Sequence, residues 1–352
     1  MSKIMVAVIG CGTIAKASHI PSYVNNPECE VKYFCDNDLQ RAQEVVNEYK
    51  IGKAISDYRE ILNDPQLDAV SICTPNNTHK TMSVDFLLAG KHVLCEKPAA
   101  RTYAEALEMQ EACRKSGKIL NIGVVNRFSE AVNRIKNMVD AGDLGEVYHV
   151  YGSFRMGRMI PGLGGDFTTN KISGGGVLID WGVHFLDLIM YCIGDPNPTT
   201  VSGQAYCKLG KDMKNYTYID MWAGPPDYSG TYDVDDFVTG LIRTTGPTIS
   251  INGAWAQNIF EKELYVDFIG DKAGVRLNYG GDFVLYTTKD NALITTTPEF
   301  QKPDMFQAEI DDFLNCVRTG EKSQAHIDTV IITSRIMQAL YDSSQQGKEI
   351  TL

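Results

Sequence analysis

The first part of the chain alternates short apolar runs with segments of helical periodicity. The apolar runs are rich in β-branched residues, which predicts strands at residues 3–10, 31–36, 68–75, 92–98 and 118–125. Apolar side chains spaced by about 3.6 residues predict helices between them, at residues 36–50, 76–90 and 102–117. Repetition of strand, helix and strand predicts a parallel sheet, so the first domain is expected over residues 1–124.

After Asn126 the pattern becomes α+β. A helix is predicted over residues 130–142, and a strand over 147–156. Further strands, joined by Gly, Asp and Asn turns, are predicted at residues 234–245, 247–257, 262–271, 273–280 and 282–288. Two helices near 304–318 and 325–343 close the chain. Successive strands with few helices predict an antiparallel sheet, and the second domain is expected over residues 125–352.

Composition narrows the class of protein. With 43% hydrophobic and 22% charged residues, the chain is typical of a globular protein. The net charge of −11 and the absence of a Lys/Arg cluster argue against a nucleic-acid partner. We find no cleavable leader and no long hydrophobic segment, so no membrane partner and a cytoplasmic location are expected. Nine cysteines without a CxxC pair fit reduced thiols.

A glycine-rich turn follows the first predicted strand. Gly10, Gly12 and Ala15 form a GxGxxA pattern at the start of a predicted helix. Gly10 allows the tight turn, Gly12 lets a pyrophosphate approach the backbone, and Ala15 keeps the helix near the sheet. The backbone N–H groups at the helix start, including those of Thr13 and Ile14, are expected to face the phosphates.

Asp36 ends the second predicted strand, where a carboxylate can accept both hydrogen bonds of an adenosine ribose diol. It would repel a 2′-phosphate, which favours NAD over NADP. Asn37 is expected beside it at the cofactor. Asn37 and the nearby Arg41 weaken the preference for NAD, because an arginine can hold a 2′-phosphate. The alternative is that Asp36 only caps the following helix.

Two further turns lie at strand ends expected to face the cofactor. Thr74 and Asn76 follow the predicted strand at 68–75 and are expected at the edge where a cofactor crosses the sheet. Pro75 and Asn76 could instead only cap the next helix. His79, expected near the nicotinamide, could be structural. Glu96 and Lys97 lie at the end of the predicted strand at 92–98. A lysine there can donate to a substrate hydroxyl, although a surface Glu–Lys pair is the alternative.

Residues 173–191 are almost wholly apolar after their glycines, yet contain Asp180 and His184. Residues four apart share one face of a helix, so both side chains are expected on one polar stripe. Neutral imidazole can take the proton that an alcohol loses during oxidation. The alternative is a buried histidine satisfied inside the core, with Asp180 as a helix cap.

Together the stretches GCGTIA, CTPNNTH, CEKPAA, GVVNRF and GGGVLIDWGVHFLDL resemble the Gfo/Idh/MocA family of nicotinamide-dependent sugar oxidoreductases. The resemblance extends over most of the chain. It implies an α/β protein with an N-terminal Rossmann domain, followed by an α+β domain with a large, mostly antiparallel sheet. Members of this family often form homo-oligomers through the open face of that sheet, so a dimer or larger assembly is expected.

The resemblance also implies roles for the polar residues. Lys97, Asp180 and His184 correspond to the catalytic set, with His184 as the base and Lys97 stabilising alkoxide character. Asp180 would orient the substrate or pair with Lys97. Glu96 is expected on the cofactor side. Asn126, in GVVNRF, is expected near both nicotinamide and substrate.

Three more residues are candidates for substrate contact. Arg155 and Arg158 could reach a sugar hydroxyl or carboxylate, although exposed arginines commonly do neither. Trp255 could stack on a sugar ring or belong to the core. We find no metal-binding motif, so no metal is expected.

Three functions follow from this sequence. The first is NAD-dependent oxidation of a ring hydroxyl in a sugar, glycoside or cyclitol, including formation of a 3-oxo-glycoside. The second is an NAD-retaining glycoside hydrolase that oxidises C3 transiently and eliminates the aglycone. The third is a non-catalytic NAD- or sugar-binding regulator, which the intact EKP and DxxxH motifs disfavour.

Overall fold

The computed structural model describes residues 2–352 and divides into two compact units. The first contains the chain through Phe128 together with Asp304–Ile331, and the second contains Ser129–Pro303 and Ile332–Leu352. The sequence placed all of 125–352 in the second domain, so the return of Asp304–Ile331 differs from that expectation.

The first unit is built on a six-stranded parallel sheet of order β3-β2-β1-β4-β5-β6. Its strands are β1 (Ile4–Ile9), β2 (Cys29–Cys35), β3 (Lys53–Ile55), β4 (Ala69–Ile72), β5 (His92–Glu96) and β6 (Leu120–Gly123). This order is that of a Rossmann domain, whose chain reverses direction across the sheet between β1 and β4. All the strands predicted in this half are present. The three-residue β3 was not predicted because it is too short to show a period.

Helical segments connect these strands. They are a π-helical turn η1 (Ala15–His19) continued by α1 (Ile20–Val24), then α2 (Leu39–Tyr49), η2 (Tyr58–Ile61), α3 (Asn76–Leu88), α4 (Tyr103–Ser116) and η3 (Val125–Phe128). Asp38 and Thr102 cap the starts of α2 and α4 by accepting backbone N–H groups. Gly117 ends α4 in the left-handed conformation.

The returning segment completes the first unit. Helix α8 (Met305–Thr319) contributes Ile310, Phe313 and Leu314 to the apolar cluster that also contains Ile20 and Tyr23. Burial of this apolar face explains why α8 belongs to the first unit although it follows the second in sequence. The start of α9 (Ile327–Gln346) lies beside β6, where the backbone N–H of Ile122 donates to the carbonyl of Ala325 at 3.0 Å.

The second unit contains a nine-stranded sheet of order β14-β13-β12-β11-β7-β10-β9-β8-β15, in which only β7 and β10 are parallel among the described neighbours. The strands are β7 (Val147–Arg155), β8 (Pro198–Tyr206), β9 (Phe237–Thr244), β10 (Thr248–Ala254), β11 (Glu263–Gly270), β12 (Ala273–Asn278), β13 (Asp282–Lys289), β14 (Ala292–Thr296) and β15 (Ile350–Thr351). The predicted mostly antiparallel sheet is therefore confirmed. Strands β8, β14 and β15 were not predicted.

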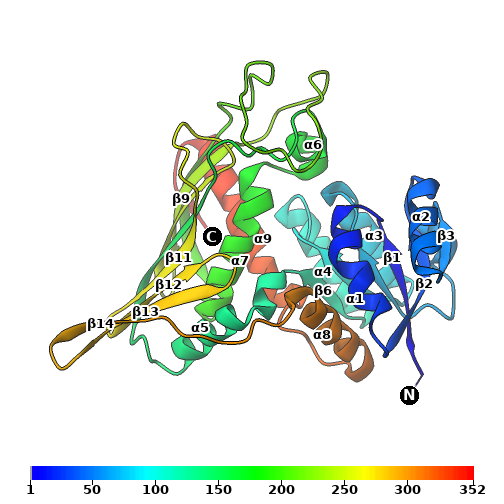
Figure 1. Ribbon diagram of the computed structural model, residues 1–352, viewed down its shortest axis with the longest axis horizontal. Helices are drawn as coiled ribbons and strands as arrows, with labels where there is room; N and C mark the ends of the chain where they lie inside the picture. Colours follow the sequence, from blue (N-terminus) through cyan, green and yellow to red (C-terminus); the bar gives the residue numbers. More distant parts are fainter. Residues whose placement is uncertain (1) are drawn as a thin grey trace. The chain divides into compact units, whose positions relative to one another are not determined.

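Helices α5 (Glu130–Asp140), α7 (Val183–Cys192) and the end of α9 cover one face of this sheet (Figure 1). Phe154 of β7 faces α7, where its ring lies 5.1 Å from that of Phe185. Because successive residues of a strand point to opposite faces, Ser153 and Arg155 lie on the face that none of the described helices covers. On that face they contact Glu263 of β11.

Asn170–Cys192 is the single stretch of the described residues that is long and apolar enough to cross a membrane. It contains α6 (Asn170–Ser173), η5 (Leu178–Gly182) and α7. In the structure 72% of its apolar window is buried, as in the core helix of a globular domain.

Candidate active site

The glycine turn connects β1 with η1 and has the form that a dinucleotide pyrophosphate requires. Gly10 has a φ of +90°, and a Cβ added there would lie 2.6 Å from the carbonyl oxygen of Cys73, at the end of β4. Only glycine fits such a backbone. A Cβ added to Gly12 would meet nothing within 4 Å, so space lies over that residue. The turn thus fits NAD, with room above Gly12 for a pyrophosphate.

Asp36 follows β2 and is tied to the glycine turn. Its Oδ2 accepts the backbone N–H of Cys11 at 2.9 Å, and its Oδ1 accepts that of Asp38 at 3.0 Å. Arg41 approaches Oδ2 at 3.5 Å. A carboxylate has about four acceptor positions, and these contacts occupy three of them, so Oδ1 retains one position for a ribose hydroxyl. The cap of α2 is Asp38 rather than Asp36, which removes the capping alternative for Asp36.

Asp36→Asn is expected to lower kcat/KM with NAD by about tenfold and to reduce the preference for NAD over NADP, since a hydrogen bond to a charged group contributes about 1.5–3 kcal/mol. Asparagine can still accept the N–H of Cys11, so the turn is expected to persist. Initial rates with each coenzyme provide the measurement, and Asp38→Asn is the matched control. An unchanged coenzyme ratio in Asp36→Asn would contradict the role.

Thr74 and Asn76 lie at the carboxyl end of β4, as expected. Thr74 Oγ1 is 2.7 Å from Thr78 Oγ1, and Asn76 is the first residue of α3. The N-cap position of α3 is Pro75, without a side-chain cap, so Asn76 does not occupy the capping position. Thr13 and Ile14 directly follow Gly12, and Asn37 directly follows Asp36. Thr13 and Asn37 are exposed, whereas Ile14 is half-buried.

His79 is placed differently from the expected cofactor contact. It is 0% exposed. Its Nδ1 lies 2.8 Å from the carbonyl oxygen of Pro98, and its Nε2 lies 2.8 Å from that of Thr74. Burial lowers the pKa of His79 despite these two carbonyl contacts. His79 thus joins the turn after β4 to the segment after β5, and its enclosed ring does not contact a cofactor.

Glu96 and Lys97 lie at the end of β5. Glu96 is buried, with its carboxylate against His19 and the backbone N–H of Lys97, whereas Lys97 is half-buried. Glu96 therefore fixes the backbone of Lys97 from inside the core and is not placed to reach a cofactor. Asn126 is buried in η3, directly after β6.

In the second unit, the glycines before η5 allow a close backbone contact. A Cβ on Gly176 would lie 1.8 Å from the carbonyl oxygen of Asp235. The Asp235 carboxylate accepts the backbone N–H groups of Gly176 at 2.7 Å and Leu178 at 3.0 Å, and the hydroxyl of Tyr341 at 2.7 Å. Asp235 therefore fixes the start of the helix that carries Asp180. The role of Asp235 was not predicted, because no local sequence pattern links residue 235 with residue 176.

Asp180 and His184 occupy the junction between η5 and α7. All residues from Gly182 through Cys192 are buried except His184, which is half-buried. The rings of His184 and Tyr279 lie 6.4 Å apart in an edge arrangement. Asp187 is 1% exposed and accepts from Thr333, which fits a structural role. A polar group that is partly accessible within an otherwise buried helix is the arrangement expected of a catalytic base.

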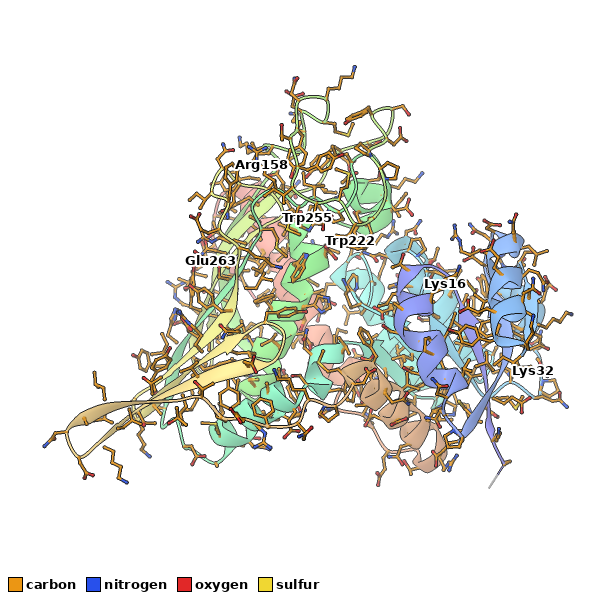
Figure 2. The ribbon with its side chains drawn as sticks, in the orientation of Figure 1. Lys16, Lys32, Arg158, Trp222, Trp255 and Glu263 are labelled. Carbon is orange, nitrogen blue, oxygen red and sulfur yellow. The ribbon has the colours of Figure 1, made fainter. Side chains whose placement is uncertain are left out.

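Trp255 follows β10 and is placed beside Asp180 rather than on a sugar-binding surface. Trp255, labelled in Figure 2, is 0% exposed. Its Nε1 donates to Oδ2 of Asp180 at 3.1 Å. Its ring faces are covered by the core, which rules out stacking on a substrate. The sequence could not distinguish these two environments, because a single tryptophan at the end of a predicted strand carries no sign of its burial.

Trp255→Phe is expected to lower kcat about tenfold, because one hydrogen bond to a buried carboxylate is lost at about 1.5–3 kcal/mol. NAD affinity is expected to stay constant, since Trp255 lies in the other unit from the glycine turn. Trp222→Phe is the matched control, as Trp222 is exposed. Steady-state kinetics and NAD titration of both variants test the expectation, and equal kcat values in the two variants would refute it.

The two candidate arginines are engaged elsewhere. Arg155 forms an ion pair with Glu263 on the face of the sheet that no described helix covers, opposite the face toward which Phe154 points. It therefore does not share a face with the Asp180 helix. Arg158 donates to Asn258 and to the carbonyl oxygen of Thr217, and its guanidinium lies 5.5 Å from the ring of Tyr216. Its contacts hold the long 207–235 segment.

That segment runs beside residues 158–168. Backbone N–H groups of Ile219, Ala223 and Asp227 donate to the carbonyls of Arg158, Pro161 and Leu163. Trp222 meets Phe167 edge to face at 5.0 Å. The two segments therefore form one paired arm.

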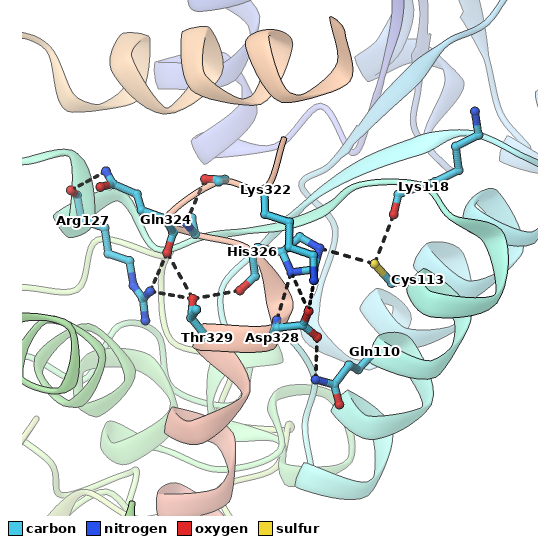
Figure 3. A network of polar contacts seen from close by, with 11 residues as sticks. Gln110, Cys113, Lys118, Arg127, Lys322, Gln324, His326, Asp328 and Thr329 are labelled. Carbon is cyan, nitrogen blue, oxygen red and sulfur yellow. Dashed lines mark hydrogen bonds and ion pairs between the residues drawn. The ribbon is translucent and has the colours of Figure 1, made fainter. Parts of the chain in front are cut away.

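A second polar cluster has the residue types of a nucleophile triad (Figure 3). Cys113 Sγ lies 3.6 Å from His326 Nε2, and His326 Nδ1 lies 3.4 Å from Asp328 Oδ2. Burial raises the pKa of the Cys113 thiol and lowers the pKa of His326, so neither group is activated. The thiol donates to the carbonyl of Lys118 at 3.2 Å. This cluster joins the returning segment to α4.

Comparison with known proteins places this arrangement in a class. The family model described as "Oxidoreductase family, NAD-binding Rossmann fold" matches residues 4–124, and "GFO/IDH/MocA C-terminal domain" matches residues 132–276. The protein is thus an oxidoreductase that acts on CH–OH groups with NAD as its cofactor. More particularly, the chain belongs to the Gfo/Idh/MocA family.

Several relatives and structures are similar over nearly the whole chain. D-glucoside 3-dehydrogenase of Escherichia coli (strain K12) is 31% identical, covering 100% of this chain and 98% of its own. scyllo-Inositol 2-dehydrogenase (NAD(+)) of Bacillus subtilis (strain 168) is 25% identical over 91% of this chain and 87% of its own. A levoglucosan dehydrogenase in complex with NADH and levoglucosan aligns with a TM-score of 0.87 at 21% identity, covering 99% of each chain.

Proposed function

We propose that this protein oxidises the C3 hydroxyl of a glucoside-type sugar to a ketone with NAD. The observation that carries the proposal is the 31% identity over the entire chain with a D-glucoside 3-dehydrogenase. The half-buried His184, within an otherwise buried helix, supports the proposal because its partly accessible imidazole can act as the base that oxidation of an alcohol requires.

In the proposed reaction the carbinol carbon loses a hydride and the hydroxyl loses a proton. NAD supplies the hydride acceptor. His184 takes the hydroxyl proton, and Lys97 donates a hydrogen bond to the oxygen as negative charge develops on it. Asp180, held by Trp255, orients the substrate through its carboxylate. The products are a ketone, reduced cofactor and one proton.

The direct test is a panel of glucosides, free sugars and inositols with NAD, followed at the absorbance band of reduced nicotinamide. The expected result is NADH formation that is fastest with glucosides, together with a product ketone at C3 by NMR. NADH formation from inositols alone would overturn the glucoside assignment. Ketone at another ring position would overturn the assignment to C3.

The same panel separates the glycoside hydrolase hypothesis. Chromogenic glucosides report release of the aglycone, while absorbance reports net reduction of NAD. Aglycone release without net NADH would replace the dehydrogenase proposal by an NAD-retaining hydrolase. NADH formed in equal amount to the ketone, with the glycosidic bond intact, is the result expected here.

A further inference from the structure

His19 and Glu96 form a buried pair in the first unit that the proposed chemistry does not use. They are 1% and 7% exposed. Nε2 of His19 lies 2.8 Å from Oε1 of Glu96, and Nδ1 lies 2.8 Å from Oγ of Ser71, which is wholly buried on β4. His19 is the last residue of η1, and Glu96 is the last of β5. The imidazole therefore ties the helix after the glycine turn to two neighbouring strands.

The second oxygen of Glu96 is directed at the backbone of its neighbour. Oε2 accepts the backbone N–H of Lys97 at 3.0 Å. On the adjacent strand β6, a Cβ added to Gly123 would lie 3.2 Å from Oε1 and Cδ of Glu96. Glycine at this position leaves room for the carboxylate. The carboxylate is thus enclosed, with His19 and the Lys97 backbone as its polar neighbours.

The two side chains stabilise each other's charge. Burial by itself lowers the pKa of His19, but Cys73 and the hydrogen-bonded Glu96 outweigh it, so this pKa lies well above its usual range. Burial by itself raises the pKa of Glu96, but the hydrogen bond and charge of His19 outweigh it, so this pKa lies below its usual range. An imidazolium also donates from both nitrogens, to Glu96 and to Ser71. Removing either partner leaves the other as a buried charge without compensation.

We infer that His19 is a positioning residue for Lys97 and that it acts through Glu96. The His19 imidazole fixes the position of the Glu96 carboxylate. That carboxylate accepts the backbone N–H of Lys97 and so fixes the backbone from which the Lys97 side chain extends. Because His19 belongs to the helix that follows the glycine turn, the same contact joins the dinucleotide-binding turn to the lysine. This inference rests on the proposed function, in which Lys97 donates to the substrate oxygen.

Kinetics of single and double variants test the pair as a unit. Glu96→Gln and His19→Leu are each expected to lower kcat by about ten- to a hundredfold, since a misplacement of about 1 Å can cost a hundredfold. KM values for NAD and glucoside are expected to change less than twofold. The double variant is expected to be no worse than the worse single variant. His19→Gln keeps a donor toward Glu96 and is expected to recover part of kcat relative to His19→Leu.

A second measurement does not depend on turnover. Hydrogen–deuterium exchange at the Lys97 amide reports whether its N–H remains bonded to Glu96. Exchange is expected to be slow in the wild type and at least about tenfold faster in Glu96→Ala and His19→Leu. His92→Gln is the matched control, because His92 is a partly buried histidine of β5 that accepts from Ile119 and does not contact Glu96.

The outcomes distinguish a positioning role of the pair from a purely structural one. If His19→Gln, His19→Leu and Glu96→Gln unfold at lower temperature but retain kcat and a protected Lys97 amide, the pair is only structural and the inference fails. If effects on kcat are additive in the double variant, it also fails. If His19→Leu does not fold, the two Gln variants, which keep hydrogen-bonding groups, decide. Absence of NADH formation from every glucoside in the wild type would instead refute the proposed function itself, whereas full turnover in Lys97→Met would remove only the role of Lys97 in it.

Discussion

Replacing Lys97 with methionine is expected to lower kcat at least about a thousandfold, as acid–base and electrostatic contributions of one group reach 10²–10⁴-fold. Methionine keeps the length and much of the volume of the side chain but cannot donate to a developing alkoxide. NAD affinity is expected to change less than about twofold, because the pyrophosphate contacts lie at the glycine turn. Steady-state turnover with a glucoside and titration of NAD provide the two measurements.

Lys80→Met is the matched control for this prediction. Lys80 is a half-buried lysine of α3 that pairs with Glu108 at 3.1 Å. Its loss removes the same charge from the same unit and is expected to leave kcat within a factor of about two, since ion pairs at the surface contribute about 0–1 kcal/mol. Comparable losses of kcat in Lys80→Met and Lys97→Met would show a general charge effect and remove Lys97 from its role.

The second large effect is expected at the glycine turn, where two glycines differ in kind. Gly12→Val is expected to weaken NAD binding about a hundredfold, because its side chain occupies the space above the turn and displaces hydrogen bonds to charged phosphate worth about 1.5–3 kcal/mol each. The fold is expected to persist, as a Cβ at Gly12 meets nothing within 4 Å. Isothermal titration with NAD measures the affinity, and thermal unfolding without NAD measures stability.

Gly10→Ala is the counterpart that separates binding from folding. Its φ of +90° and the 2.6 Å approach of an added Cβ to the Cys73 carbonyl are expected to cost about 2–5 kcal/mol of unfolding free energy. Gly10→Ala should therefore unfold at a lower temperature, whereas Gly12→Val should not. Equal loss of stability in both variants would contradict the distinction between a packed glycine and an open one.

Much of the first unit could be predicted because its strands are buried on both sides. Such strands are continuous apolar runs, and β1, β4 and β5 were found from this signal. The three residues of β3 show no period, and β14 carries exposed side chains on both faces, so neither gave a signal. The place of α8 depends on which core covers its apolar side, and local sequence does not carry that information.

The candidate site was predicted where chemistry follows directly from a turn or a strand end. Gly10, Gly12 and Asp36 meet at one edge of the first sheet, as expected from their order. Arg155 was misplaced although a signal existed. It follows Phe154 in a strand, so the two must point to opposite faces. The contact between His19 and Glu96 joins residues that are far apart in sequence, so no local sequence pattern could predict it.

The chain enters and leaves the first unit more than once, and this limits how the protein can be dissected. A cofactor-binding module cut after residue 124 would lack Ile310, Phe313 and Leu314, and would open the apolar cluster beside Ile20 to water. Coenzyme preference could be exchanged between relatives by swapping the N-terminal fragment. Such a swap must also include Asp304–Ile331, which belongs to the same unit. Point substitutions around Asp36 avoid that requirement and are the simpler route to altered coenzyme use.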